Sequence, residues 1–158
     1  MNKVFVDSGA WISCINKSDK HHKKALSYLK ELRNNNIPLF TSNYVKAETL
    51  TWLKYNTYHQ KEIKAIELWE KAERKKQLKT YWVTEEISKE AEKIFKKYDD
   101  HTLSLTDCTS FAICRKHEIK KVFSFDEDFN ILGYLLAPYQ IKEENKISYN
   151  VLYSGKLP

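Results

Sequence analysis

The sequence predicts an α/β fold in which helices cover both faces of a mostly parallel sheet of four or five strands, a three-layer α/β/α sandwich. Short runs of β-branched and aromatic residues recur along the chain, and longer stretches with helical spacing of apolar residues separate them. Two such helical stretches follow each of the first three runs. Connections of that length allow crossovers between parallel strands, so the order of segments predicts a parallel sheet.

Four predicted strands are short apolar runs bounded by polar residues. The first, Val4-Phe5-Val6, has a large apolar side chain at every position, as expected for a strand buried on both faces of a parallel sheet. A further edge strand or hairpin is predicted between residues 141 and 152, where apolar and polar residues alternate. The other predicted strands cover residues 39–41, 80–84 and 122–125.

Six helical segments are predicted from apolar residues that recur three and four positions apart. Ser42 precedes the third segment as a cap, and Ser104 with Asp107 has the form of a capping box at the start of the sixth. The segments cover residues 10–15, 21–33, 43–55, 61–77, 85–97 and 104–115. The residues predicted to face inward in the fourth and fifth are Ile63, Ile66, Trp69, Ala72, Ile87, Ala91, Ile94 and Phe95.

The length of 158 residues predicts one domain over 1–158, with the motifs in 3–130 and a C-terminal extension, 131–158, packed on it. A content of 42% hydrophobic residues with three glycines and three prolines excludes a disordered or collagenous chain. The formal net charge of +6 suits a polyanion such as nucleic acid, although Lys-rich proteins without that role share it.

The cysteine pattern and the termini predict a soluble cytoplasmic protein. Cys14, Cys108 and Cys114 form no CxxC motif, and two of them fall in a predicted helix, where we interpret them as small core residues. This pattern is typical of a protein in a reducing compartment. Asp7 interrupts the N-terminal apolar run, so we expect no signal peptide. No apolar stretch is long enough for a membrane span.

Four acidic residues stand at positions that the fold alone does not explain. Asp7 and Asp126 directly follow predicted strands, and Glu48 and Asp107 interrupt apolar faces of predicted helices. For Asp7 alone, the simpler interpretation is an N-cap for the helix that begins near Ala10. A carboxylate buried at the end of a strand is costly unless a partner or a metal ion compensates it.

The predicted topology brings these acids together. Asp7 and Asp126 emerge at the same edge of a parallel sheet, and a helix that starts at this edge would place Asp107 nearby. Clustered carboxylates raise one another's pKa unless a cation is present. Their oxygen atoms suit Mg²⁺ or Mn²⁺, ions that activate water in phosphodiester cleavage, alone or as a pair about 3.5–4 Å apart.

Four segments, VFVDSGAW, TSNYVKAETL, SLTDCTSFAI and VFSFDEDF, occur in this order between residues 4 and 129. In this order and spacing they resemble the signature segments of the PIN domain, and especially those of VapC-type toxin ribonucleases. The resemblance implies a compact α/β/α sandwich that acts as a metal-dependent single-strand endoribonuclease with Mg²⁺ or Mn²⁺.

The resemblance also implies roles for individual residues. Asp7, Glu48 and Asp107 match the acidic pocket, and Asp7 and Asp107 match its direct metal ligands. Asp126 matches the fourth acid, so that all four are candidate catalytic and metal-binding residues. Either Glu48 or Asp126 could serve as the general base. Ser8 and Ser42 match small hydroxyl positions near the pocket.

Several nearby residues have two interpretations. Lys46, Arg115 and Lys116 lie close to the motifs and could hold flanking phosphates, but a solvated helix charge is the simpler interpretation of each. Asp128 is interpreted mainly as a structural cap. Trp52, Phe111 and Phe123 occupy predicted core positions, and the five histidines show no metal-binding spacing.

The resemblance implies RNA as substrate, a homodimer, and an antitoxin protein that inserts a basic residue into the acidic groove. Two alternatives remain open. One is a PIN-domain nuclease that processes RNA without being a toxin. The other is a non-catalytic PIN-like module that binds RNA or protein, although a carboxylate cluster without a metal would repel phosphate.

Overall fold

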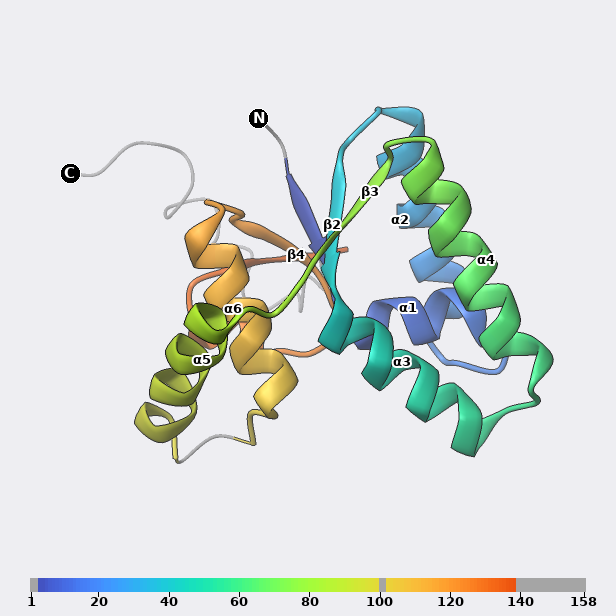
Figure 1. Ribbon diagram of the computed structural model, residues 1–158. Coiled ribbons are helices and arrows are strands. Elements are labelled where there is room, and N and C mark those ends of the chain that lie inside the picture. Colours follow the sequence, from blue (N-terminus) through green and yellow to red (C-terminus); the bar gives the residue numbers. More distant parts are fainter. Residues whose placement is uncertain (1–2, 100–101, 139–158) are drawn as a thin grey trace, which may run out of the picture.

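Five strands form one parallel sheet within the described residues, which are 3–99 and 102–138 of this computed structural model. They are β1 (Val4–Val6), β2 (Leu39–Ser42), β3 (Leu78–Tyr81), β4 (Lys121–Phe123) and β5 (Leu135–Ala137). The spatial order is β3-β2-β1-β4-β5, and each neighbouring pair is parallel. The first strand of the chain therefore lies at the centre of the sheet (Figure 1).

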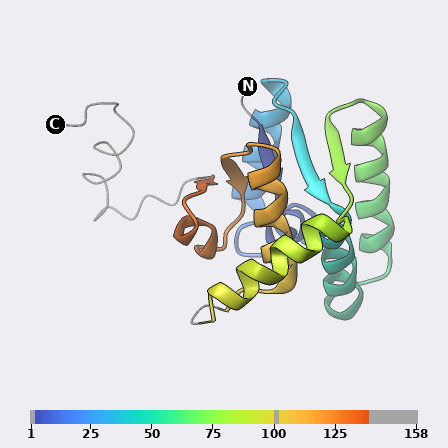
Figure 2. The same cartoon turned by 60° about the vertical axis from the view of Figure 1, so that its left-hand side comes forward.

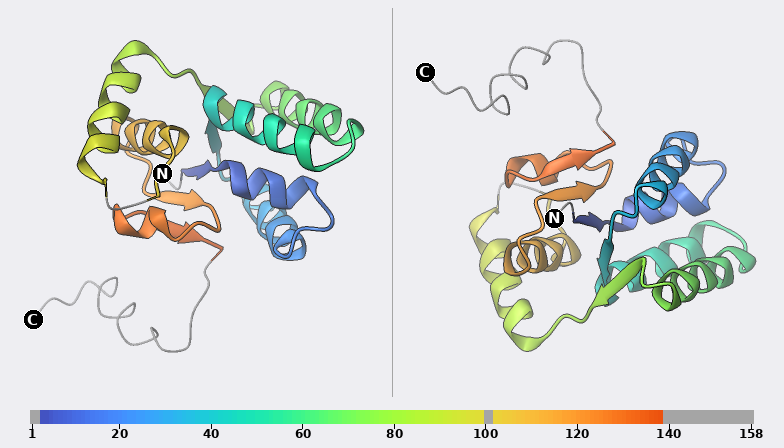
Figure 3. Two further views of the ribbon diagram at one scale, coloured as in Figure 1. Left: turned by 90° about the horizontal axis from the view of Figure 1, so that it is seen from below. Right: turned by 90° about the horizontal axis from the view of Figure 1, so that it is seen from above.

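Helices cover both faces of this sheet, which confirms the predicted α/β/α sandwich. In the described part of the chain they are α1 (Ser8–Ile15), α2 (His22–Asn34), α3 (Asn43–Asn56), α4 (Gln60–Arg74), α5 (Glu85–Lys97), α6 (Leu105–Lys116) and the short α7 (Asp128–Ile131). Helices α1 to α4 lie on one side of the sheet, and α5 and α6 lie on the other (Figures 1 and 3). Helix α5 packs across α6 (Figure 2). None of the described helices is both long and apolar enough to span a membrane.

The direction of the chain through the sheet explains this division of the helices. The chain steps from β1 outward to β2 and β3, and then returns past β1 to β4. Because crossovers between parallel strands are right-handed, the return places α5 and α6 on the opposite face. The carboxyl ends of β1 and β4 thus form a switch point, where open α/β sheets bind their ligands.

Strand β1 is held on both sides. Phe5 pairs with Phe40 of β2 and with Val122 of β4, and all three residues of β1 are buried. The pairing continues one residue beyond the strand, because the Asp7 N–H donates to the Phe123 carbonyl at 3.0 Å. Asp7 is therefore fixed to the centre of the sheet through its backbone.

A polar contact lies within the core beside β1. The Thr41 hydroxyl donates to the Val6 carbonyl at 3.0 Å and accepts from the Trp11 indole N–H at 3.3 Å. The ring of Trp11 meets that of Trp69 edge to face, with centroids 5.9 Å apart. These contacts join β1, β2, α1 and α4, which places the start of α1 firmly against the sheet.

The structure differs from the prediction at the third and last strands. β3 begins at Leu78, two residues earlier than predicted, and ends before Trp82, which is 72% exposed. β5 was not predicted, because Leu135–Ala137 is too short to show an alternating pattern. The predicted strand or hairpin at 141–152 lies outside the described residues.

The inward face of α4 also differs from the prediction. Ile63 and Ile66 are 45% and 41% exposed, whereas Glu62, Ala65 and Trp69 are buried. Packing against α3 and β3 turns this helix by about one residue relative to the apolar pattern. Phe95 of α5, also predicted to face inward, is 50% exposed, while Ile87, Ala91 and Ile94 are buried as predicted.

Candidate active site

A cleft with a volume of about 570 Å³ opens at the carboxyl ends of β1 and β4. Its walls come from the start of α1, the loop between α1 and α2, the helix α3, the start of α6 and the segment after β4. Asp7, Glu48, Asp107 and Asp126 all line this cleft. The fold therefore brings the four predicted acids together.

Asp7 is 4% exposed and has two roles. Its Oδ2 atom caps α1 by accepting from the Gly9 N–H at 3.4 Å, and it accepts from the Ser124 hydroxyl at 3.0 Å. Its Oδ1 atom is buried and has no hydrogen-bond partner among the described residues. Burial, with the charges of Asp107 and Glu48, raises the pKa of Asp7 to about 7.

Asp107 is held by the capping box at the start of α6. Its Oδ2 atom accepts from the backbone N–H and the hydroxyl of Ser104, at 2.8 and 2.7 Å, and the Ser104 Oγ atom accepts from the Asp107 N–H at 3.1 Å. Burial raises the pKa of Asp107, and the charges of Asp126 and Asp128 add to this, while the bonds from Ser104 lower it.

Glu48 is half-buried on α3, one turn before Trp52, which also lines the cleft. Burial raises the pKa of Glu48, and the charge of Asp107 raises it further. A hydrogen bond with the Ser8 side chain acts in the opposite direction. Glu48 is therefore predisposed to hold a proton at higher pH than an exposed glutamate. Trp52 is only half-buried, in contrast to Phe111 and Phe123, which are buried as predicted.

Asp126 is exposed at the edge of the cleft and organises the segment after β4. Its backbone N–H donates to the Ser124 hydroxyl at 3.1 Å, and its Oδ1 atom accepts from the Asp128 N–H at 2.9 Å. Asp128, interpreted above as a cap, is the first residue of α7. The carboxylate that accepts from the start of this helix belongs to Asp126 instead.

The donor set fits a divalent cation in its chemistry. Asp7, Glu48 and Asp107 share one cleft, burial and then their mutual repulsion raise the pKa of Asp7 and of Glu48, and one buried Asp7 oxygen lacks a partner among the described residues. A hard cation would relieve this repulsion and satisfy that oxygen. Within the described residues, no three His, Cys, Asp or Glu side chains are already arranged around a metal position. The fit therefore rests on the type and charge of the donors.

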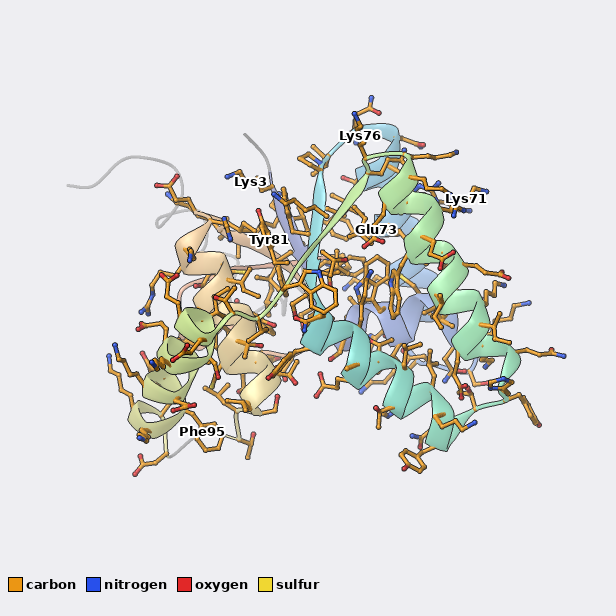
Figure 4. All side chains as sticks on the ribbon, viewed as in Figure 1. Lys3, Lys71, Glu73, Lys76, Tyr81 and Phe95 are labelled. Atoms are coloured by element: carbon orange, nitrogen blue, oxygen red, sulfur yellow. The ribbon has the colours of Figure 1, made fainter. Side chains whose placement is uncertain are left out.

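Of the predicted substrate-binding residues, only Ser8 lines the cleft. Ser42 is buried, and its hydroxyl caps α3 by accepting from the Val45 N–H at 3.1 Å. The Lys46 ammonium lies 2.6 Å from the carboxylate of Glu73, a residue in the last turn of α4 whose side chain lies on the side toward β3 (Figure 4). Arg115 pairs with Glu90 on the outer surface of α5 and α6, and Lys116 pairs with Glu86. The three cations thus pair with glutamates that lie outside the lining of the cleft.

Two serines that support the acids were not predicted as site residues. Ser104 was recognised only as a helix cap, yet its two hydrogen bonds fix the carboxylate of Asp107. Ser124 joins Asp7 to the backbone of Asp126. Its position two residues before an acid that follows a strand is a local turn pattern that could have indicated it.

The model of the PIN domain family matches residues 4–133, most of the chain. The chain belongs to this family. PIN domains are typically metal-dependent, in agreement with the donor set of the cleft.

The chain is similar to the 23S rRNA-specific endonuclease VapC20 of Mycobacterium tuberculosis, with 29% identity over 133 residues, 84% of this chain and 95% of the relative. The crystal structure of VapC20, described as a Sarcin-Ricin loop cleaving toxin, gives a TM-score of 0.71 at 30% identity and covers 84% of this chain and 96% of that one. VapBC2 from Rickettsia felis, bound to a DNA fragment from its promoter, and FitAcB from Neisseria gonorrhoeae share the fold, with TM-scores of 0.64 and 0.58 at 10% and 14% identity. They cover 87% and 84% of this chain, and 99% and 95% of their own.

Proposed function

We propose that this protein is a VapC-type endoribonuclease that hydrolyses phosphodiester bonds in RNA with Mg²⁺ or Mn²⁺. One observation carries the proposal: Asp7, Glu48 and Asp107 share a cleft in which their pKa values are raised and one buried carboxylate oxygen has no partner. Burying such a cluster costs free energy unless a cation is bound, and a bound cation can in turn hold a phosphate. The similarity to a 23S rRNA-specific endonuclease supports RNA as the substrate.

Asp7 and Asp107 would hold the ion, because each is fixed by the fold before any ligand binds. A bound divalent ion neutralises charge on the scissile phosphate and lowers the pKa of a water molecule. Glu48, which lines the same cleft from α3 and accepts a hydrogen bond from the Ser8 hydroxyl, would take the proton of the attacking water. Asp126 helps to order the segment after β4 and completes the acidic edge.

The partners follow from the same cleft. A protein inhibitor that inserts a lysine or arginine would pair with these acids and occupy the place of the cation. We propose an antitoxin of this kind, a homodimer in solution and a location in the cytoplasm. The solved relative VapBC2, a complex from Rickettsia felis, supports the first of these by its fold.

The test is cleavage of 23S rRNA and of unrelated RNAs by purified protein with Mg²⁺, with Mn²⁺ or with EDTA. We expect cleavage only with a metal ion, and its loss in Asp107→Asn, which preserves the size of the side chain. Glu67→Gln changes an exposed glutamate of α4 outside the cleft and serves as a matched control that keeps activity.

Cleavage in EDTA, or full activity of Asp107→Asn, would contradict the proposed chemistry. Metal-dependent cleavage by a protein whose expression leaves cell growth unchanged would point to the non-toxin RNA-processing alternative. Binding of RNA without cleavage or metal-dependent stabilisation would point to a non-catalytic module.

A further inference from the structure

Part of the cleft wall carries aromatic rings and basic side chains in addition to acids. The rings of His21 and Phe125 stack there, with centroids 4.2 Å apart and planes 4° from parallel. Lys20 lies beside His21 in the same wall, and Trp52 lines the cleft from α3. Among the described residues of the lining, Lys20 and His21 are the only two that can carry positive charge. The cleft thus has a second chemical character besides its acids.

The loop that carries His21 is fixed to α1. The Asp19 Oδ1 atom accepts from the Ser13 hydroxyl at 3.0 Å and from the His21 N–H at 2.7 Å. The ring of the next residue, His22, shares a hydrogen bond with the Ser13 carbonyl at 2.7 Å. The loop therefore presents the His21 ring to the cleft in a defined position before a ligand arrives.

The second ring is fixed from the sheet. Phe125 follows β4, and its ring meets the ring of buried Phe123 edge to face, with centroids 6.0 Å apart. Both His21 and Phe125 remain half-buried, so each keeps part of its ring accessible from the cleft. A platform that is ordered in advance costs little further ordering when a ligand binds.

Stacking suits the substrate of this cleft. The acids that gather a cation repel every phosphate that the cation does not neutralise, so contacts to the rest of an RNA strand cannot all be ionic. Unpaired bases stack on aromatic side chains, and this contact needs no countercharge. A base that stacks on an outer face of this pair of rings can therefore hold a nucleotide in the cleft, although the acids repel its phosphate.

We propose that the His21–Phe125 pair is a stacking subsite for one unpaired nucleobase of the RNA, adjoining the scissile phosphate, and that Lys20 contacts a neighbouring phosphate. This inference rests on the proposed endoribonuclease function and names how that cleft holds its substrate. It makes His21 a positioning residue rather than a catalytic one.

The first test is the variant His21→Ala, which removes the ring without removing a cap, since the His21 side chain makes no capping hydrogen bond to α2. We expect KM for a single-stranded RNA substrate to rise about 10-fold with kcat nearly unchanged. His21→Phe should restore KM because it keeps a flat ring, whereas His21→Lys, which keeps only a charge, should not. His117→Ala is the matched control, because His117 stacks on Tyr81 at 3.9 Å outside the cleft lining.

The second test moves the change to the RNA. Removing single bases near the cleaved bond, with the phosphates kept, should raise KM at one position as much as His21→Ala does. At that position the two changes together should cost no more than either alone, because they delete the same contact. An unchanged KM in His21→Ala, rescue by lysine equal to rescue by phenylalanine, or effects that multiply at every position would overturn the subsite.

Failure of the proposed function would look different. If the wild type cuts no RNA under any metal condition, the proposed function fails, and binding of RNA that carries 2-aminopurine still decides the inference. Quenching of this base by the wild type and by His117→Ala, but not by His21→Ala, supports the subsite. Equal quenching by all three overturns it.

Discussion

At the scale of single residues, Asp7 combines a structural task with the chemical one that we propose for it. The Oδ2 atom caps α1 and accepts from Ser124, while the buried Oδ1 atom is left for a ligand. The two interpretations of Asp7 that the sequence allows, cap and metal ligand, are therefore not exclusive, because each uses a different oxygen. The cost of this arrangement is an ionised group in a buried place.

We predict that Asp7→Asn stabilises the metal-free protein at alkaline pH. The folded state raises the pKa of Asp7 from 3.8 to about 7 and so binds its proton more tightly than the unfolded state does. The contribution of Asp7 to the stability of the wild type should therefore be most favourable below about pH 4. It should be lost as the pH rises through about 7. Above that pH the variant should gain on the order of 4 kcal/mol. Urea unfolding in EDTA at several pH values measures this.

Glu48 and Asp107, whose pKa values are also raised, should leave part of the pH dependence in the variant. Glu67→Gln, on the exposed surface of α4, should follow the wild-type curve. A variant Asp7→Asn that is less stable than the wild type at pH 8 in EDTA would refute the account of this site.

Ser124 offers a second prediction at this scale. Its hydrogen bond lowers the pKa of Asp7, so Ser124→Ala should raise that pKa. The acidic limb of the pH–activity profile should then move to higher pH. Single-turnover cleavage across pH 5–9 at one subsaturating Mg²⁺ concentration would show it, because saturating Mg²⁺ displaces the proton of Asp7 and hides the shift. Ser27→Ala, on the exposed side of α2, should not move the limb, and a shift to lower pH would count against the assignment.

At the scale of elements, the start of α6 joins helix capping to the chemistry of the cleft. Ser104 and Asp107 satisfy each other's backbone N–H groups, and the same bonds fix the Asp107 carboxylate. The acid also lies at the positive end of the helix dipole, which favours its ionised form. One helical turn therefore supplies both the boundary of the helix and a ligand position.

We predict that Ser104→Ala costs about 1 kcal/mol of unfolding free energy and also lowers cleavage activity. Thr84→Ala is the matched comparison, because Thr84 caps α5 by accepting from the Ile87 N–H but lies outside the cleft lining. It should lose a similar amount of stability and keep activity. Equal losses of activity in both variants, measured far below their unfolding midpoints, would show that Ser104 acts through stability alone.

The elements could be predicted from local patterns, and the differences arise where packing overrides them. Strand β1 has three apolar residues in a row, a pattern that only a buried parallel strand explains well. On α4 the pattern misled, because Glu62 is buried with its Oε2 atom 2.7 Å from the Nδ1 atom of His59, a pairing that no periodicity reveals. Trp82 has strong β-propensity but lies beyond the last pair of β3.

At the scale of the whole molecule, the cations near the motifs pair with glutamates outside the cleft lining. Lys46 pairs with Glu73, whose carboxylate also accepts from Thr80, so this cation ties α3 to α4 and β3. Arg115 ties α6 to α5. The acidic cluster therefore lacks these cations as counter-ions, in a protein whose net charge is +6.

We predict that Mg²⁺ stabilises the wild type and fails to stabilise Asp107→Asn. An ion that binds only the folded state adds about 2.7 kcal/mol at a concentration of about 100 times its Kd. Thermal unfolding with increasing MgCl₂ measures the gain, and NaCl at matched ionic strength separates it from screening. Equal shifts in Tm with both salts, or in both proteins, would argue against a specific site.

The site could be predicted from the sequence in its acids but not in its neighbourhood. Asp7, Glu48, Asp107 and Asp126 stood out because each broke an apolar pattern or followed a strand, and the structure places all four in one cleft. The destinations of long flexible side chains depend on partners distant in sequence, which the linear pattern does not show. For that reason the sequence offered only a solvated charge or a phosphate contact for Lys46, and neither its pairing with Glu73 nor the stacking of His21 on Phe125 was expected.

The central place of β1 has a consequence for the time at which the protein becomes active. β1 is synthesised first, whereas its neighbour β4, with Ser124 just beyond it, emerges more than a hundred residues later. A growing chain therefore carries Asp7 without the strand and the serine that position it. The cleft forms only after β4 has emerged from the ribosome and paired with β1. During synthesis the cleft is therefore not assembled until most of the described chain has emerged from the ribosome.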